Sequence, residues 1–210
     1  MFKKLPLGLL LISPFSALAH PHAFIDMQTK PLVKDNQLIG FSTQWLLDEA
    51  SSSAVLYDVK QAKGDKAAQQ KLVDEVMANV VNEHYFSYVF DKENHKIKYT
   101  KHPENYGMRV KGNEVEYYFD FLLAQPQALQ NNEFTLMTYD RTYYVAMRYA
   151  ETGKRAVDFS SLPANCKGEV LEPNVDEKIQ SYASSLDKSQ KNEDDSLGAL
   201  FAQKVKIKCE

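Results

Sequence analysis

The central part of the chain is a succession of short segments rich in aromatic and β-branched residues, and these segments constrain the fold most strongly. Such residues are enriched in strands, and several short strands at this spacing are typical of an antiparallel sheet or a β-sandwich. Lys111-Gly112-Asn113 separates two of them as a hairpin turn. We expect strands over residues 85–90, 96–99, 106–110, 114–123, 133–139 and 142–149, with a loop over residues 124–132.

Two further strands precede this region, and a helical insertion separates them from it. Residues 23–33 and 38–47 alternate apolar and polar positions around the turn signal Asp35-Asn36, so we expect a hairpin. Asp48 or a nearby serine can cap a first helix, and a second helix is expected over residues 66–84. Its apolar residues follow three- and four-residue spacing at Leu72, Val73, Val76, Met77, Val80 and Val81. The expected fold class is therefore α+β.

The C-terminal part differs in composition from the rest of the chain. Residues 174–186 predict an amphipathic helix, and residues 187–196 are polar and charged, as in a flexible linker. Residues 197–202 predict one or two helical turns. Residues 204–208 alternate lysine with Val205 and Ile207, which is typical of an edge strand. One more strand is expected at residues 157–159.

The chain has two cysteines, Cys166 and Cys209. In an oxidising compartment such a pair most simply forms one disulfide, which would tether the C-terminal tail to the sheet. Closing a loop of this length stabilises a fold by roughly 3–4 kcal/mol on the chain-entropy estimate. The alternative is a pair of thiolate metal ligands, although neither cysteine has a second cysteine or a histidine at ligand spacing.

Residues 1–19 have the three-part form of a secretory signal. Lys3 and Lys4 provide the positive start, residues 5–15 a short apolar run, and residues 16–19 the small residues of a cleavage site. The run is shorter than the about 20 apolar residues that span a bilayer. We expect cleavage after Ala19, export to the periplasm, and no insertion of the mature chain into the membrane. The expected organisation is a signal peptide (1–19), a main α+β domain (20–173), and a helix, linker and tethered strand (174–210).

Cleavage after Ala19 would make His20 the first residue and would place three nitrogen donors within three residues. These donors are the terminal amine and the imidazoles of His20 and His22. They suit Zn(II), Cu or Ni. Pro21 has no N–H to lose, so the square-planar copper mode that uses the second amide is blocked, and a brace of the amine and the His20 ring remains. The alternative is a solvated terminus without metal.

Asp26, Asp48, Glu49 and Asp140 are the acidic candidates to complete this site or to orient a histidine. The structural alternatives are a helix cap for Asp48 and a turn residue for Asp140. Among the other histidines, His84 is expected to cap a helix C-terminus or to be packed. His95 and His102 lie in lysine-rich turns and are expected to be solvated.

Charge and motifs exclude several function classes. The formal net charge is −3, and loss of Lys3 and Lys4 with the signal makes it more negative, so nucleic acid is not an expected partner. The chain has no nucleophilic serine in a Gly-x-Ser-x-Gly setting, no metalloprotease helix motif and no phosphate-binding glycine loop. We therefore expect that the protein is not an enzyme.

Several stretches together resemble a family of periplasmic proteins associated with nickel/cobalt-type permeases, which includes the ZevA-type zinc-transport accessory proteins. The resemblance covers nearly all of the mature chain. It implies assistance to metal transport with an inner-membrane permease as partner. The stretches that carry it are residues 20–26, Trp45 with Asp48-Glu49, residues 83–86 and 139–145, Cys166, and residues 197–202 with Cys209.

These observations lead to one leading hypothesis and two alternatives. The leading hypothesis is a periplasmic accessory protein that binds a divalent metal, zinc in the first place, for a membrane permease. The first alternative is a copper enzyme or redox protein with a histidine brace, because plain nitrogen donors bind Cu(II) more tightly than Zn(II). The second is a metal-free structural adaptor of the permease.

Overall fold

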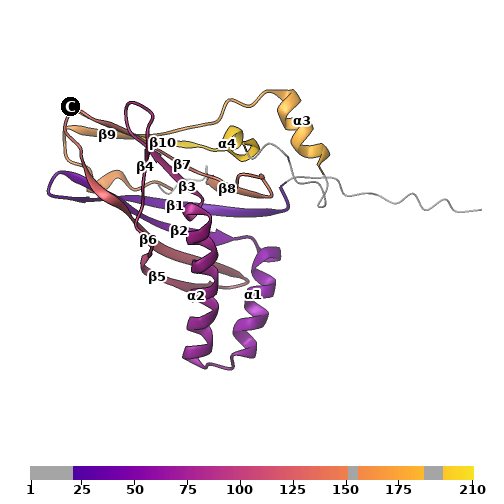
Figure 1. Ribbon diagram of the computed structural model, residues 1–210. Helices are drawn as coiled ribbons and strands as arrows, with labels where there is room; N and C mark the ends of the chain where they lie inside the picture. The colour runs from indigo at the N-terminus through magenta and orange to yellow at the C-terminus, as the bar shows by residue number, and fades with distance from the viewer. Residues whose placement is uncertain (1–20, 151–155, 187–195) are drawn as a thin grey trace, which may run out of the picture.

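The computed structural model describes residues 21–150, 156–186 and 196–210. The predicted signal peptide, His20 and nearly all of the predicted linker lie outside the described residues. The described residues form an α+β structure with two five-stranded sheets, a pair of helices after the first hairpin, and a disulfide at the C-terminal strand (Figure 1). This confirms the fold class expected from the sequence.

The first sheet, sheet A, has the strand order β5-β6-β2-β1-β8. The predicted hairpin is present, and its turn residues Asp35 and Asn36 have φ values of 50° and 56°, as in a type I′ turn. Most of the sheet is antiparallel, but β1 and β8 pair in parallel, with Ala23 opposite Val145. The strands are β1 (Ala23–Lys34), β2 (Gln37–Leu47), β5 (Glu104–Lys111), β6 (Glu114–Ala128) and β8 (Val145–Tyr149).

The second sheet, sheet B, is antiparallel, with the order β4-β3-β7-β10-β9. Its strands are β3 (Ser87–Phe90), β4 (Lys96–Ile97), β7 (Glu133–Thr138), β9 (Cys166–Leu171) and β10 (Lys204–Cys209). The expectation of an edge strand at the C-terminus is wrong, because β10 pairs with β7 on one side and β9 on the other. The alternation of lysine with apolar residues indicates that one face of the strand is exposed to solvent. It does not indicate whether the strand lies at the edge or inside the sheet. β9 itself was not predicted.

The helical insertion follows β2, as expected. Aspartate side chains cap three helices, because Asp48, Asp65 and Asp176 each accept a hydrogen bond from a backbone N–H of the first turn. The first helix is tied to sheet A by the Ser52 hydroxyl, which accepts a hydrogen bond of 2.9 Å from the Val115 N–H. The helices are α1 (Glu49–Gln61), α2 (Lys66–Asn82), α3 (Glu177–Ser185) and α4 (Leu197–Phe201), with 3₁₀ turns at His84–Phe86 and Phe159–Ser161. Figure 1 shows α1 and α2 beside β5 and β6.

The main core contains the inward-facing residues of both sheets and the buried stripe of α2. Tyr85, 2% exposed, stacks on Phe119 and Phe121 with ring centroids 5.9 Å and 5.3 Å away. A second, smaller cluster joins α3 to α4 through Ala183, Leu186 and Leu197. The main core includes Met27, Phe41, Trp45, Phe119 and Phe121 of sheet A, Val89, Phe134, Leu136, Val205 and Ile207 of sheet B, and Val73, Met77 and Val80 of α2.

The structure differs from the sequence expectations at several element boundaries. The expected loop over residues 124–132 begins later, because β6 continues to Ala128 through a register shift opposite Leu38 and Gly40. This shift lies beside Pro126, which has no N–H for a regular ladder. The strand expected from residue 85 starts at Ser87, because residues 84–86 form a turn with φ between 48° and 57°. The strand expected at residues 157–159 is a single bridge from Val157 to Thr29.

The disulfide between Cys166 and Cys209 is formed, as predicted, and it joins register partners of β9 and β10. Both sulfur atoms are therefore engaged, and the alternative of two thiolate ligands is excluded. A structural disulfide is typical of proteins in an oxidising compartment. Within the described ranges, no helix has the length and apolar composition that crossing a membrane requires.

Candidate metal centre

His22 is fixed to the start of sheet A. Its N–H donates a hydrogen bond of 2.8 Å to the Tyr144 carbonyl, and its ring centroid lies 5.0 Å from that of Tyr144. The next residue, Ala23, begins β1, which has β2 on one side and β8 on the other. The position of His22 is therefore determined by the sheet.

Asp48 lies at the same end of the sheet. One carboxylate oxygen accepts a bond of 2.7 Å from the Ser51 N–H, and the other accepts a bond of 2.7 Å from the Phe24 N–H. Burial by itself would raise the pKa of Asp48, but the hydrogen bonds from Ser51, Phe24 and Ala50 outweigh it, so the pKa lies below its usual value. Asp48 thus caps α1 and also holds the start of β1. Its neighbour Glu49 is exposed in the first turn of α1.

Asp140 organises the turn that leads into β8. Its carboxylate accepts hydrogen bonds of 3.0 Å from the N–H groups of Thr142 and Val145. The same turn receives α4, because the Gly198 N–H donates a bond of 3.1 Å to the Arg141 carbonyl. A Cβ at Gly198 would lie 1.7 Å from the Asp140 carbonyl oxygen, so only glycine permits this approach.

The structure therefore gathers His22, Asp48 and Asp140 at one end of sheet A. Asp48 bonds the backbone of Phe24, and Asp140 bonds the backbone of Val145, which is the register partner of Ala23. Both carboxylates accept hydrogen bonds from backbone N–H groups. Within the described ranges, these side chains do not form a group of three donors within 4.8 Å of one another. His20, the other predicted donor, lies outside the described residues.

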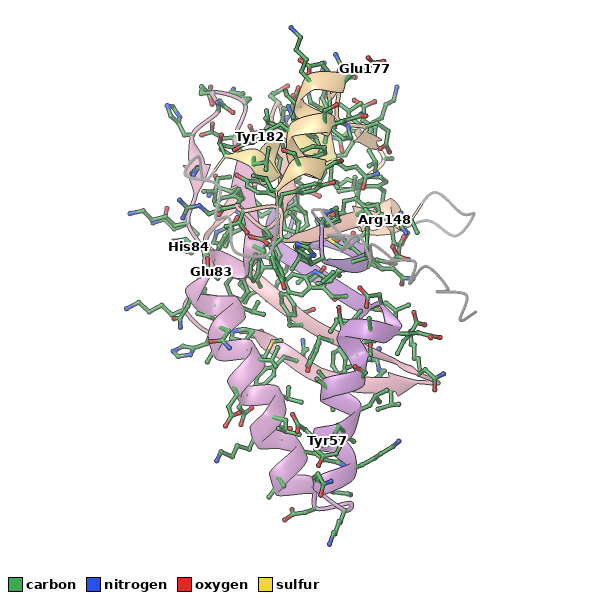
Figure 2. All side chains as sticks on the ribbon, turned by 90° about the vertical axis from the view of Figure 1, so that its right-hand side faces the viewer. Tyr57, Glu83, His84, Arg148, Glu177 and Tyr182 are labelled. Carbon is green, nitrogen blue, oxygen red and sulfur yellow. A yellow bond between two sulfur atoms is a disulfide. The ribbon has the colours of Figure 1, made fainter. Side chains whose placement is uncertain are left out.

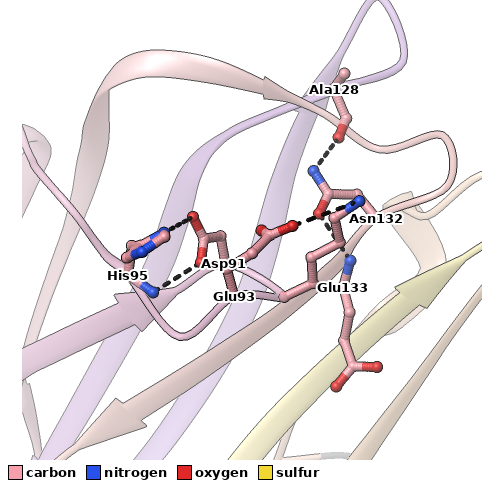
Figure 3. A network of polar contacts seen from close by, with 7 residues as sticks. Asp91, Glu93, His95, Ala128, Asn132 and Glu133 are labelled. Atoms are coloured by element: carbon pink, nitrogen blue, oxygen red, sulfur yellow. Dashed lines mark hydrogen bonds and ion pairs between the residues drawn. The ribbon is translucent and has the colours of Figure 1, made fainter.

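A different group of donors does converge, in the turn between β3 and β4. Asp91, Glu93 and His95 each place one potential ligand atom within 4.8 Å of the other two (Figure 3). Asp91 organises the turn, since its carboxylate accepts a bond of 2.7 Å from the His95 N–H and lies 3.3 Å from His95 Nδ1. Asn94 makes the sharp bend possible with a φ of 64°, a conformation that asparagine tolerates well.

The chemistry of this turn suits a divalent transition metal. One imidazole and two carboxylates are common ligands of Zn(II). Asp91 is partly buried, while Glu93 and His95 are exposed, so an ion would be reached from solvent. Lys92, whose Nζ lies 3.7 Å from the Glu93 carboxylate, competes with an ion for that carboxylate.

The sequence reasoning missed this group because it interpreted His95 as a solvated turn residue. The available signal is the spacing Asp91-x-Glu93-x-His95 directly after a strand, which a tight turn folds onto one side. Among the residues that the structure describes, no other histidine joins a group of this kind. His84 is exposed at the end of α2 (Figure 2), so the expectation of a packed side chain is wrong, and His102 is exposed as expected.

Comparisons with known proteins show which family the chain belongs to. The family model described as "Protein of unknown function (DUF1007)" matches residues 5–209. A protein of Haemophilus influenzae (strain ATCC 51907 / DSM 11121 / KW20 / Rd), described as an uncharacterized protein, is 64% identical over 207 residues. That alignment covers 99% of this chain and 98% of the relative. No solved structure matches the chain. With nearly its whole length covered in both comparisons, the chain belongs to the DUF1007 family.

Proposed function

We propose that this protein is an exported accessory protein that binds a divalent metal ion, zinc in the first place, and that it is not an enzyme. The observation that carries the proposal is the convergence of Asp91, Glu93 and His95 within 4.8 Å in one short turn. One imidazole nitrogen together with two carboxylates is a donor set for Zn(II) and related ions. Exposure of the turn favours an ion that is taken up and released over an ion buried as a structural element.

The histidines at the predicted mature N-terminus are the second proposed site. Its support is the anchoring of His22, whose backbone is bonded to Tyr144 directly before β1. With cleavage after Ala19, the amine and ring of His20 would reach an ion together with His22. Asp48 and Asp140 would then act by holding the strands that position the terminus, as their backbone hydrogen bonds suggest.

The proposed partner is an inner-membrane metal permease, and the proposed compartment is the periplasm. The proposal of a permease partner depends on the sequence resemblance to transport accessory proteins. The compartment is supported by the form of residues 1–19 and by the Cys166–Cys209 disulfide. An accessory role requires metal that exchanges rapidly, and the exposed donors Glu93 and His95 meet that requirement.

The test is a zinc titration of the exported, untagged protein in competition with a chromogenic chelator. Intact mass first identifies the N-terminal residue. We expect His95→Ala to weaken zinc binding at one site at least tenfold, and His22→Ala to weaken the terminal site by a similar factor. His102→Ala is the matched control, because His102 is also an exposed histidine of a lysine-containing turn, without a converging pair of acids.

Zinc affinity and stoichiometry that are both unchanged in both variants would exclude both sites. Absence of stoichiometric zinc in the wild-type protein would favour the metal-free adaptor. The copper alternative has its own signature. A Cu(II) electron paramagnetic resonance spectrum with nitrogen couplings, lost when His20 is replaced by alanine, would point to a histidine brace.

A further inference from the structure

The outer face of sheet B carries a row of lysines on a central strand. Residues Val205, Ile207 and Cys209 of β10 point into the core, and Lys204, Lys206 and Lys208 therefore point to the opposite face. Side chains on one face of a strand recur every second residue, about 7 Å apart. This positive row contrasts with the formal net charge of −3 for the whole chain.

A groove lies over part of this face. It has a volume of about 470 Å³, and its lining combines the apolar side chains Phe90, Met137 and Tyr139 with charged side chains, among them the carboxylates of Asp91 and Glu133. The β3–β4 turn, through Asp91 and Lys92, and α4, through Ala199, also line it. The β-ladder explains the arrangement, because Phe90, Thr135 and Lys206 lie on one cross-strand row, while Met137 and Lys204 form the neighbouring pair. Ligand sites of small molecules have volumes of this order.

Three lysines, Lys92, Lys204 and Lys206, line the groove, and Lys92 and Lys206 have carboxylate partners among the described residues. Lys206 forms an ion pair with Glu133, with the two atoms 3.2 Å apart. Lys204 is exposed and has no carboxylate within ion-pair distance in the part of the chain that the structure describes. The groove therefore presents the ammonium group of Lys204 beside apolar side chains, together with the Lys206–Glu133 ion pair and the Thr135 hydroxyl.

We propose that this groove binds an organic anion with an apolar body. The apolar body would lie over Phe90, Met137 and Tyr139, and the anionic group would meet the ammonium groups of Lys204 and Lys206. Hydrogen bonds between ionised partners are stronger than neutral ones, and burial of the apolar body adds a favourable hydrophobic contribution. The groove shares Asp91 with the candidate metal turn, but the proposal requires no bound metal.

Two related fluorescent probes test this groove. Anilinonaphthalene sulfonate has an aromatic body with an anionic group, and phenylnaphthylamine has a similar body without charge. We expect the wild-type protein to bind the sulfonate saturably, at least tenfold more tightly than the neutral probe, which corresponds to about 1.4 kcal/mol. Added salt should weaken binding of the sulfonate, because partly exposed charges are screened.

The variant Lys204→Gln with Lys206→Gln should weaken sulfonate binding at least tenfold and leave binding of the neutral probe unchanged. Lys208→Gln is the matched control, because Lys208 lies on the same strand and face but does not line the groove. Thermal unfolding of each variant confirms that the fold is intact. Equal affinity of wild type and double variant for the sulfonate, or an equal loss in Lys208→Gln, would overturn the proposal.

Discussion

The side-chain amide of Gln203 takes the place of a neighbouring strand beside Tyr149. Its Oε1 accepts a hydrogen bond of 2.6 Å from the Tyr149 N–H, and its Nε2 donates to the Tyr149 carbonyl at 3.4 Å. Tyr149 ends β8 at the edge of sheet A, while Gln203 directly precedes β10 of sheet B. One buried side chain thus connects the two sheets and satisfies the backbone of an edge strand.

Replacing Gln203 should therefore destabilise the protein. Gln203→Ala leaves the buried backbone groups of Tyr149 without this partner, and an unsatisfied buried group costs about 1–3 kcal/mol. We expect a loss of about 2 kcal/mol in the free energy of unfolding, measured by urea denaturation. Gln127→Ala is the control, because the Gln127 side chain is only partly buried and donates its hydrogen bond to the nearby Gln125 carbonyl. Equal midpoints for both variants would contradict the connecting role of Gln203.

Asp48 should contribute more stability than an ordinary helix cap. Asp48→Ala removes the cap of α1 and also the bond to the Phe24 N–H, so we expect a loss of about 1–2 kcal/mol at neutral pH. Asp65→Ala is the matched control, because Asp65 caps α2 through the N–H groups of Ala67 and Ala68 alone. Urea denaturation should show the larger loss for Asp48→Ala, and the opposite order would refute the double role.

The contribution of Asp48 should depend on pH in one direction. Its folded-state pKa lies below its ordinary value of 3.8, so its stabilisation is present above that value and is lost as pH falls through the folded pKa. The difference in unfolding free energy between wild type and Asp48→Asn should therefore shrink below about pH 4. Urea denaturation of both proteins at pH 7 and in acid measures this difference. A difference that is constant over this range would show that the charge of Asp48 is not involved.

Tyr149 should make the protein sensitive to alkali. Burial is the main cause that raises the pKa of Tyr149 to about 12, against the lowering effect of its hydrogen bonds to Thr29 and Thr138. The unfolded chain ionises this tyrosine near pH 10, so stability falls between about pH 10 and pH 12. The free energy of unfolding of Tyr149→Phe should fall less over this pH range than that of the wild type, although the variant loses the hydrogen bond to Thr29. Tyr57→Phe, at a side chain 62% exposed on α1 (Figure 2), should decline as the wild type does.

The disulfide should hold β9 against β10. Its loop spans 43 residues, and replacing both Cys166 and Cys209 by alanine should cost about 3–4 kcal/mol on the chain-entropy estimate. Urea denaturation of the wild type with reductant should give a similar loss. The cysteine-free variant should not respond to reductant, and a reductant effect in that variant would show that the disulfide is not its cause.

The candidate sites combine features that can be predicted from the sequence with features that only the tertiary structure shows. The helix-capping role of Asp48 was recognised because capping is local, and the structure adds its long-range bond to Phe24. The spacing of Asp91, Glu93 and His95 was visible in the sequence, but their convergence depends on the bend at Asn94. The groove over sheet B needs the register of β3, β7 and β10, which are far apart in sequence.

By itself, the sequence determined the fold class, the first hairpin, the two-helix insertion and the disulfide, because each follows from local periodicity, turn residues or cysteine count. Only the tertiary structure decided that β8 pairs in parallel with β1 and that β10 lies inside its sheet. The alternation of β10 specifies which side chains face the core, but it does not specify how many strands flank it. Strand pairing depends on contacts between residues far apart in sequence, such as Val205 with Leu136 and Val170. These contacts form only when the core as a whole is packed.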